Sequence, residues 1–163
     1  MKLQIFLITL FSTLPFSMAL AQTPEKTTNP QHPFAKQLET IYLKYLESAR
    51  RGDVSATLRV MTSEYAQMAK QITPELLKGM SADDLDPQKS QFIRIDVSKK
   101  KNMARAIYQK LGPERKDWTA ILFKKESGAW KIAKIVRQVR TGSETGDGLQ
   151  ELLNDTNSFL QDP

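Results

Sequence analysis

Few side chains in this sequence are suited to nucleophilic attack, proton transfer or metal binding. The chain has one histidine, His32, and no cysteine. Thiolate catalysis, thiolate metal sites and disulfides are therefore excluded. His32 stands in the proline-rich stretch QTPEKTTNPQHP without partners for a metal site nearby, so we assign it no functional role.

An acidic cluster, Asp83, Asp84 and Asp86 in SADDLDP, invites a calcium-binding interpretation. It lacks the alternating spacing and the closing glutamate of a calcium loop. Ser81 and Asp84 fit a helix cap instead. We therefore predict no metal ion and no cofactor.

Tyrosines are the remaining candidates for chemistry in a water-poor interior, where general acid and base catalysis needs a titratable group. Tyr42, Tyr45 and Tyr65 belong to helical patterns, and Tyr108 belongs to an alternating pattern. Buried tyrosines are usually core aromatics with the hydroxyl at a rim, so we predict no catalytic residue. The ligand-binding candidates are Tyr108, Tyr45 and Thr119.

The N-terminus reads MKLQIFLITLFSTLPFSMALAQ, with one lysine, an apolar run and small residues ending at Ala21. This order is typical of a bacterial secretory signal, and Pro15 and Ser17 interrupt the run that an uncleaved anchor helix would need. We predict a signal peptide at residues 1–21 with cleavage after Ala21. The mature form is then periplasmic or secreted, without a transmembrane segment and, because no cysteine follows the run, without a lipid anchor.

Residues 22–163 are enough for one domain with one core. The whole chain has 24 basic and 18 acidic residues, a net charge of +6. Because the two signs are interspersed, we interpret the basic excess as solubility first, and as affinity for anionic envelope surfaces or an acidic partner second. We expect no nucleic-acid partner for an exported protein.

The first half of the mature chain is helical by its pattern. After a leader at residues 22–33 that we expect to be disordered, apolar residues recur at helical spacing from Phe34 to Arg51. Gly52 ends this helix, and Asp53 is placed to cap a short second helix. Ser63 opens a third helix, and Thr73-Pro74-Glu75 has the cap and first-turn proline of a fourth.

The second half alternates apolar and polar residues instead. Four strands are predicted at residues 91–98, 103–110, 118–125 and 129–139, joined by short turns that make them antiparallel neighbours. The result is an α+β layered fold. The tail, residues 141–163, is predicted to hold a flexible linker and then a short amphipathic helix. This helix carries Leu149, Leu152, Leu153 and Leu160 on one stripe. We expect it to dock on apolar surface, because a short isolated helix is marginal in water.

This layout resembles the nuclear transport factor 2-like superfamily. The matching segments are Arg51-Gly52-Asp53 between the first two helices and Phe123 to Ile132, an F-K-K-x-x-G-x-W-K-I hairpin, and the match spans residues 34–140. The resemblance implies N-terminal helices on a curved four-stranded antiparallel sheet, together forming a cone. The superfamily includes isomerases, dehydratases, lipid carriers and secretion-system parts, so it leaves the function open.

Pairing the strands through their turns gives Val97 with Ala104, Tyr108 with Thr119, and Ile121 with Ala133. One face, without charged residues, is then predicted to be the core; it holds Ile93, Ile95, Val97, Ala104, Ala106, Tyr108, Thr119, Ile121, Phe123, Ala133 and Ile135. The other face mixes large apolar residues with charges; it holds Phe92, Arg94, Asp96, Met103, Arg105, Ile107, Gln109, Trp118, Leu122, Lys124, Trp130, Ile132 and Lys134.

An apolar patch ringed by charge is typical of a contact surface. The favoured interpretation is therefore a non-enzymatic binding or accessory domain that acts through this outer sheet face. The partner-binding candidates are Trp118, Trp130, Arg94, Arg105 and Lys124. A second copy of the chain in a homodimer, an envelope protein, and the C-terminal helix folding back are the alternatives for what covers the face. A carrier of lipids or small apolar molecules, and an isomerase- or dehydratase-like enzyme that uses the cone pocket, are the alternative functions.

Overall fold

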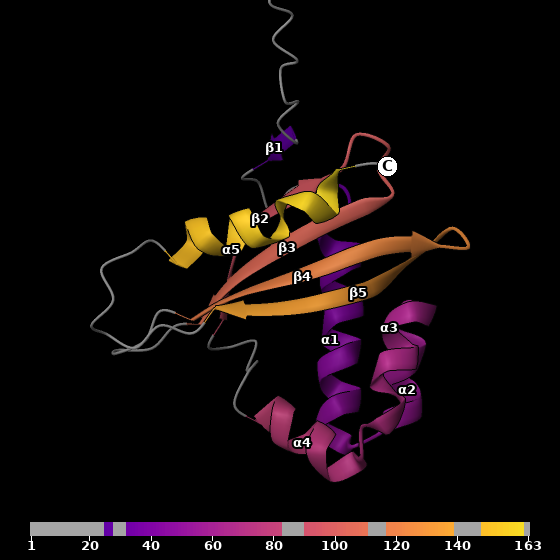
Figure 1. Ribbon diagram of the computed structural model, residues 1–163. Helices are drawn as coiled ribbons and strands as arrows, with labels where there is room; N and C mark the ends of the chain where they lie inside the picture. The colour runs from indigo at the N-terminus through magenta and orange to yellow at the C-terminus, as the bar shows by residue number, and fades with distance from the viewer. Residues whose placement is uncertain (1–24, 28–31, 83–89, 111–116, 139–147, 162–163) are drawn as a thin grey trace, which may run out of the picture.

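The computed structural model describes residues 25–27, 32–82, 90–110, 117–138 and 148–161. The predicted signal peptide, its cleavage site, the acidic cluster at residues 83–86 and nearly all of the predicted linker lie outside these ranges. The fold is α+β, as predicted. Figure 1 shows an antiparallel curved sheet with helices on both sides.

Helix α1 (Ala35–Arg51) is the longest helix and carries the predicted apolar stripe. Its buried face includes Leu38, Tyr42, Tyr45 and Leu46, which lie against the sheet. Gly52 ends the helix in the left-handed conformation with φ of 69°, as expected from its lack of a Cβ atom.

Three further helical segments follow on the same side of the sheet (Figure 1). They are α2 (Val54–Arg59), α3 (Ser63–Met68), which continues as the 3-10 turn η1 (Ala69–Gln71), and α4 (Pro74–Ala82). Asp53 caps α2 as predicted, because its carboxylate accepts a hydrogen bond from the Ala56 N–H at 2.9 Å. The Thr73 hydroxyl likewise accepts from the Leu76 N–H at 3.2 Å in the first turn of α4.

The sheet has five strands in consecutive order, β1 to β5. They are β1 (Glu25–Thr27), β2 (Ser90–Val97), β3 (Met103–Lys110), β4 (Asp117–Glu126) and β5 (Ala129–Gln138). The last four are the predicted strands. The fifth, β1, falls in the stretch that was expected to be a disordered leader; its three residues pair with β2 instead.

Two of the three predicted strand partners are confirmed, Val97 with Ala104 and Tyr108 with Thr119. The third is wrong, because Ile121 pairs with Ile135. The partners of Leu122 and Phe123 are Lys134 and Ile132, so Ala133 is an extra residue in a β-bulge.

The bulge at Ala133 reverses the faces of the residues before it. Trp130 and Ile132 were predicted on the outer face, but they lie in the core beneath the helices with exposed fractions of 4% and 0%. A second bulge, at Ile93, has the same effect in β2. It turns Phe92 toward the helices against Tyr108, while Ile93 packs on the outer face.

Helix α5 (Gly148–Asn157) and the 3-10 turn η3 (Ser158–Leu160) cover the outer face of the sheet. Leu152 and Leu153 form a second apolar cluster there with Ile107, Ala120 and Leu122. The prediction that the tail helix docks on apolar surface is therefore confirmed, and the docking site is the chain's own sheet.

Candidate functional site

A charged network is buried on the outer sheet face beneath α5. Asp96 and Arg105 are 0% and 1% exposed, and the Asp96 carboxylate accepts from Nε and Nη2 of Arg105 at 3.0 and 2.7 Å. Its other oxygen accepts from Arg94, by Nε at 3.0 Å and also by Nη2. One carboxylate thus lies between two guanidinium groups, and this arrangement satisfies its hydrogen-bonding capacity.

Arg105 also holds α5 in place. Its Nη1 donates to the Leu153 carbonyl at 2.9 Å, to the Thr156 hydroxyl at 2.6 Å and to the Asn157 side-chain oxygen at 3.1 Å. Burial lowers the pKa of Arg105, and the hydrogen bond and charge of Asp96 oppose that shift. Arg105 was predicted to bind a partner; its donors are instead taken up by Asp96 and by the chain's own helix.

The other predicted partner-binding residues are divided between the two faces. Trp118 packs beside the cluster under α5, and Arg94 is mostly buried beside Asp96. Trp130 lies on the opposite face, where its ring meets Phe34 and the ammonium of Lys125. Lys124 alone is exposed, so the sequence prediction of one continuous exposed patch is wrong. The β5 bulge removes Trp130 from the patch, and α5 covers Arg105.

An open groove of about 790 Å³ follows the free edge of the sheet, and we call it the β5 groove. Lys124 is one of its residues. Its lining combines residues of α3, of the β4 to β5 hairpin and of η3, namely Thr62, Glu64, Tyr65, Met68, Lys124, Lys125, Glu126, Ala133, Lys134, Ile135 and Phe159. Met68 is 66% exposed, so it presents apolar surface to the groove.

The backbone around the β5 groove is partly paired. On the edge of β5 that faces away from β4, the described residues form one bridge. In it the Ile132 N–H donates to the Val60 carbonyl, and the Ile132 carbonyl accepts from the Thr62 N–H, each at 2.8 Å. Beyond it, the Ile135 backbone is hydrogen-bonded to the Tyr65 hydroxyl, and burial raises the pKa of that hydroxyl. In the described residues no strand other than β4 pairs with β5 along residues 133–138, so the outer edge of β5 is unpaired there.

Two lysines give the β5 groove its free charge. Glu126 accepts hydrogen bonds from the Ser63 N–H at 3.1 Å, and Lys125 lies over the rings of Phe34 and Trp130. Lys124 and Lys134 are exposed, and within the described ranges neither side chain has a hydrogen bond or an ion pair. Their positive charge is opposed in the groove only by Glu64 and by the already bonded Glu126.

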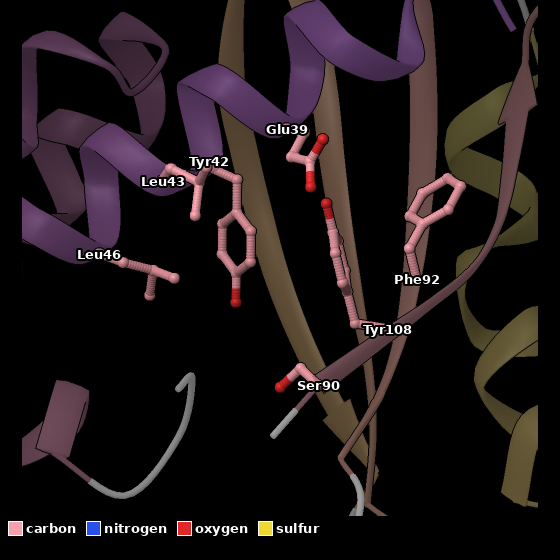
Figure 2. A pocket seen from close by; sticks show the side chains of 7 residues that line it. All are labelled: Glu39, Tyr42, Leu43, Leu46, Ser90, Phe92 and Tyr108. Atoms are coloured by element: carbon pink, nitrogen blue, oxygen red, sulfur yellow. The ribbon is translucent and has the colours of Figure 1, made fainter. Parts of the chain in front are cut away.

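A much smaller cavity, of about 60 Å³, opens between α1 and strands β2 and β3. Figure 2 shows Tyr108, Phe92 and Ser90 on the strand side, and Glu39, Tyr42, Leu43 and Leu46 on the helix side. Tyr108 therefore lies at a cavity, as a ligand-binding candidate should. Tyr45 and Thr119 do not line it, because Tyr45 stacks on Tyr42 in the core and Thr119 is buried beside its strand partners.

Sequence reasoning missed the groove residues Tyr65, Met68, Lys134 and Phe159 as site residues, and it missed Glu39 at the cavity. A signal was present for Glu39, since it precedes Tyr42 by three residues and Leu43 by four and so shares their side of the helix. No comparable signal brings α3, β5 and η3 together, because these segments are far apart in the chain.

Comparison with protein-family models, with curated proteins and with solved structures finds no match. No three histidine, aspartate or glutamate side chains gather as a metal site in the part of the chain that the structure describes. Within the same part, no helix is both long and apolar enough to span a membrane.

Proposed function

We propose that this protein is an exported, non-enzymatic binding domain of the nuclear transport factor 2-like type, and that it holds an acidic, partly apolar segment of an envelope protein in the β5 groove. The residue order of the N-terminus supports export. The order of helices followed by a curved antiparallel meander supports the fold type.

The observation that carries this proposal is the pair of lysines without counter-ions beside the exposed Met68 and the half-buried rings of Tyr65 and Phe159. Lys134 pairs with Leu122, two residues before Lys124 on β4, so the two lysines are diagonal neighbours on the same outer face. Met68, Tyr65 and Phe159 offer apolar contact next to them. Carboxylates on a partner would compensate the lysines, and its apolar side chains would cover the rings and the methionine.

The volume of the groove suits such a segment. Ligand sites commonly measure roughly 300–1,000 Å³, and the β5 groove at about 790 Å³ falls within that range. The bulge at Ala133 and the nearby lysines also discourage indiscriminate pairing of strands with this edge, which favours a specific partner that binds through its side chains.

The cavity near Tyr108 supports the two alternative functions less well. At about 60 Å³ it is far smaller than a lipid would need. Burial, and then the charge of Glu39, raise the pKa of Tyr108, so its hydroxyl is a poor proton donor or base near neutral pH.

The test uses a short fluorescein-labelled peptide in which glutamate alternates with leucine, and the same peptide with lysine in place of glutamate. We expect the acidic peptide to bind more tightly in fluorescence anisotropy. An exposed ion pair contributes about 0.2–1 kcal/mol, so reversing two charges in Lys124→Glu/Lys134→Glu should weaken binding on the order of tenfold at low salt.

The matched control reverses two exposed lysines that do not line the groove, Lys44→Glu/Lys70→Glu. It changes the net charge by the same amount and should reduce binding much less. If both double variants weaken binding equally, or if the basic peptide binds as well as the acidic one, the β5 groove is not the binding surface.

A further inference from the structure

The hydroxyl of Tyr108 is buried without a partner. Tyr108 is 7% exposed, and its oxygen has no hydrogen-bond partner among the described residues. A buried polar group without a partner is costly, and such groups are uncommon in folded proteins. Because this hydroxyl borders the cavity between α1 and β3, a bound molecule can supply the missing hydrogen bond.

The charged residues around the cavity determine which sign of charge a bound molecule can carry. Figure 2 shows the Glu39 carboxylate and the Tyr108 hydroxyl pointing toward one another from opposite walls. No lysine, arginine or histidine lines the cavity, and within the described ranges Glu39 has no ion pair. An anion would meet an uncompensated carboxylate there, whereas a cation would be attracted to it.

The aromatic walls favour an organic cation. The Tyr108 ring lies 5.0 Å from the Tyr42 ring and 5.5 Å from the Phe92 ring, measured between centroids. Aromatic faces attract ammonium groups through their quadrupoles. Leu43 and Leu46 provide an apolar wall for an alkyl chain beside them.

We propose that this cavity binds a small protonated amine. Its N–H groups would donate to the Tyr108 hydroxyl oxygen and to the Glu39 carboxylate, and its alkyl part would lie against Leu43 and Leu46. Burial keeps the Tyr108 hydroxyl neutral, so its lone pairs are free to accept from an ammonium group. The volume of about 60 Å³ is several times the roughly 10–15 Å³ that one water occupies by the same measure, which suits an ammonium head group and the first methylenes of its chain.

The test is a chemical-shift titration of the full mature protein by NMR, with three probes of matched length: n-butylammonium, n-butanol and butyrate. We expect n-butylammonium to shift the resonances of Leu43, Ser90 and Tyr108, and to bind about tenfold more tightly than n-butanol because of the ion pair and the aromatic contacts. Butyrate should bind more weakly than either.

Two test variants and one control variant locate the effect. Glu39→Gln changes an exposed side chain, so it should fold normally and remove most of the preference for the ammonium probe over the alcohol. Glu47→Gln is the matched control on the same helix, away from the cavity, and should keep that preference. Tyr108→Phe preserves the ring and should weaken n-butylammonium severalfold more than n-butanol.

Other results overturn the proposal. If n-butanol binds as tightly as n-butylammonium, or if Glu39→Gln behaves like Glu47→Gln, the cavity has no preference for amines and water is sufficient to satisfy Tyr108. The same holds if n-butylammonium shifts only resonances away from the cavity. The β5 groove is not involved in any of these outcomes, so the two sites are tested independently.

Discussion

Replacing Asp96 with asparagine removes the negative charge that lies between two guanidinium groups beneath α5. Asp96 is 0% exposed and accepts from Arg105 at 2.7 and 3.0 Å. An asparagine of the same shape would present one NH₂ group to these donors. Arg105, at 1% exposure, could then neither reach water nor keep its counter-ion.

The expected loss of folding stability in Asp96→Asn follows from this burial. Removing one partner of a buried ion pair typically costs about 3–5 kcal/mol, because the other charge stays buried without compensation. A domain of ordinary stability has about 5–15 kcal/mol in total, so Asp96→Asn should consume a large part of it. Arg94→Met is the matched control: its side chain is 12% exposed, and its loss leaves the Asp96–Arg105 pair intact. We expect that variant to lose only about 1–2 kcal/mol.

Urea unfolding followed by far-ultraviolet circular dichroism measures both losses. Asp96→Asn should lower the midpoint clearly more than Arg94→Met, with similar slopes for the two transitions. If Asp96→Asn is as stable as Arg94→Met, the buried network does not fasten α5, and the docking of this helix must depend on its leucines alone.

Two further predictions concern the tail and the cavity. Deleting residues 141–163 uncovers the sheet beneath Leu152 and Leu153, so it should raise the binding of a hydrophobic dye and cost roughly 3–6 kcal/mol of stability. A truncated chain that matches the full one in dye binding and melting temperature would contradict the docking of α5. Tyr108→Phe removes an unpartnered hydroxyl and should stabilise the ligand-free protein by about 1–3 kcal/mol in urea unfolding. Burial raises the pKa of Tyr108 above the usual 10.0, so the unfolded chain loses the proton first and the stability of the natural protein falls as pH rises past that value. The advantage of Tyr108→Phe should therefore grow by about 1.4 kcal/mol per pH unit, and an advantage that stays constant to pH 11 would show that Tyr108 is not buried as described.

The features that depend on local sequence were predictable. The stripe of α1, the left-handed Gly52 and the Asp53 cap each follow from residues within a few positions of one another. The pairs Val97 with Ala104 and Tyr108 with Thr119 follow from turn lengths and alternation. Tyr108 was also predicted as a ligand-binding candidate from its place in the alternating pattern, and it does line a cavity.

The bulges were not predicted, because strict alternation has no place for an extra residue. A sign of the β5 bulge was nevertheless present. Unbroken alternation puts Lys131 on the same face as Ala133 and Ile135, which would bury a lysine in the core. The bulge avoids this: Ile132 points into the core, while the Lys131 ammonium donates to the Arg59 carbonyl at the surface.

The occupant of the outer face depends on contacts distant in sequence. The residues of α5 show an apolar stripe, but the stripe does not specify which surface it meets. Arg105 holds α5 on this face through hydrogen bonds to Leu153, Thr156 and Asn157, which lie about fifty positions later in the chain. The β5 groove could not be predicted for the same reason, since its walls come from α3, β5 and η3.

Site-specific photo-cross-linking in the cell of origin tests the central claim most directly. A photoreactive amino acid replaces Met68 in the β5 groove, or Leu76 on α4 as a control; both side chains are exposed, at 66% and 53%. We predict a discrete cross-linked envelope protein from position 68 that is absent from position 76 and is lost in the Lys124→Glu/Lys134→Glu background. The same product from both positions, or a product from position 68 that survives the charge reversal, would contradict the assignment of the β5 groove as the binding surface.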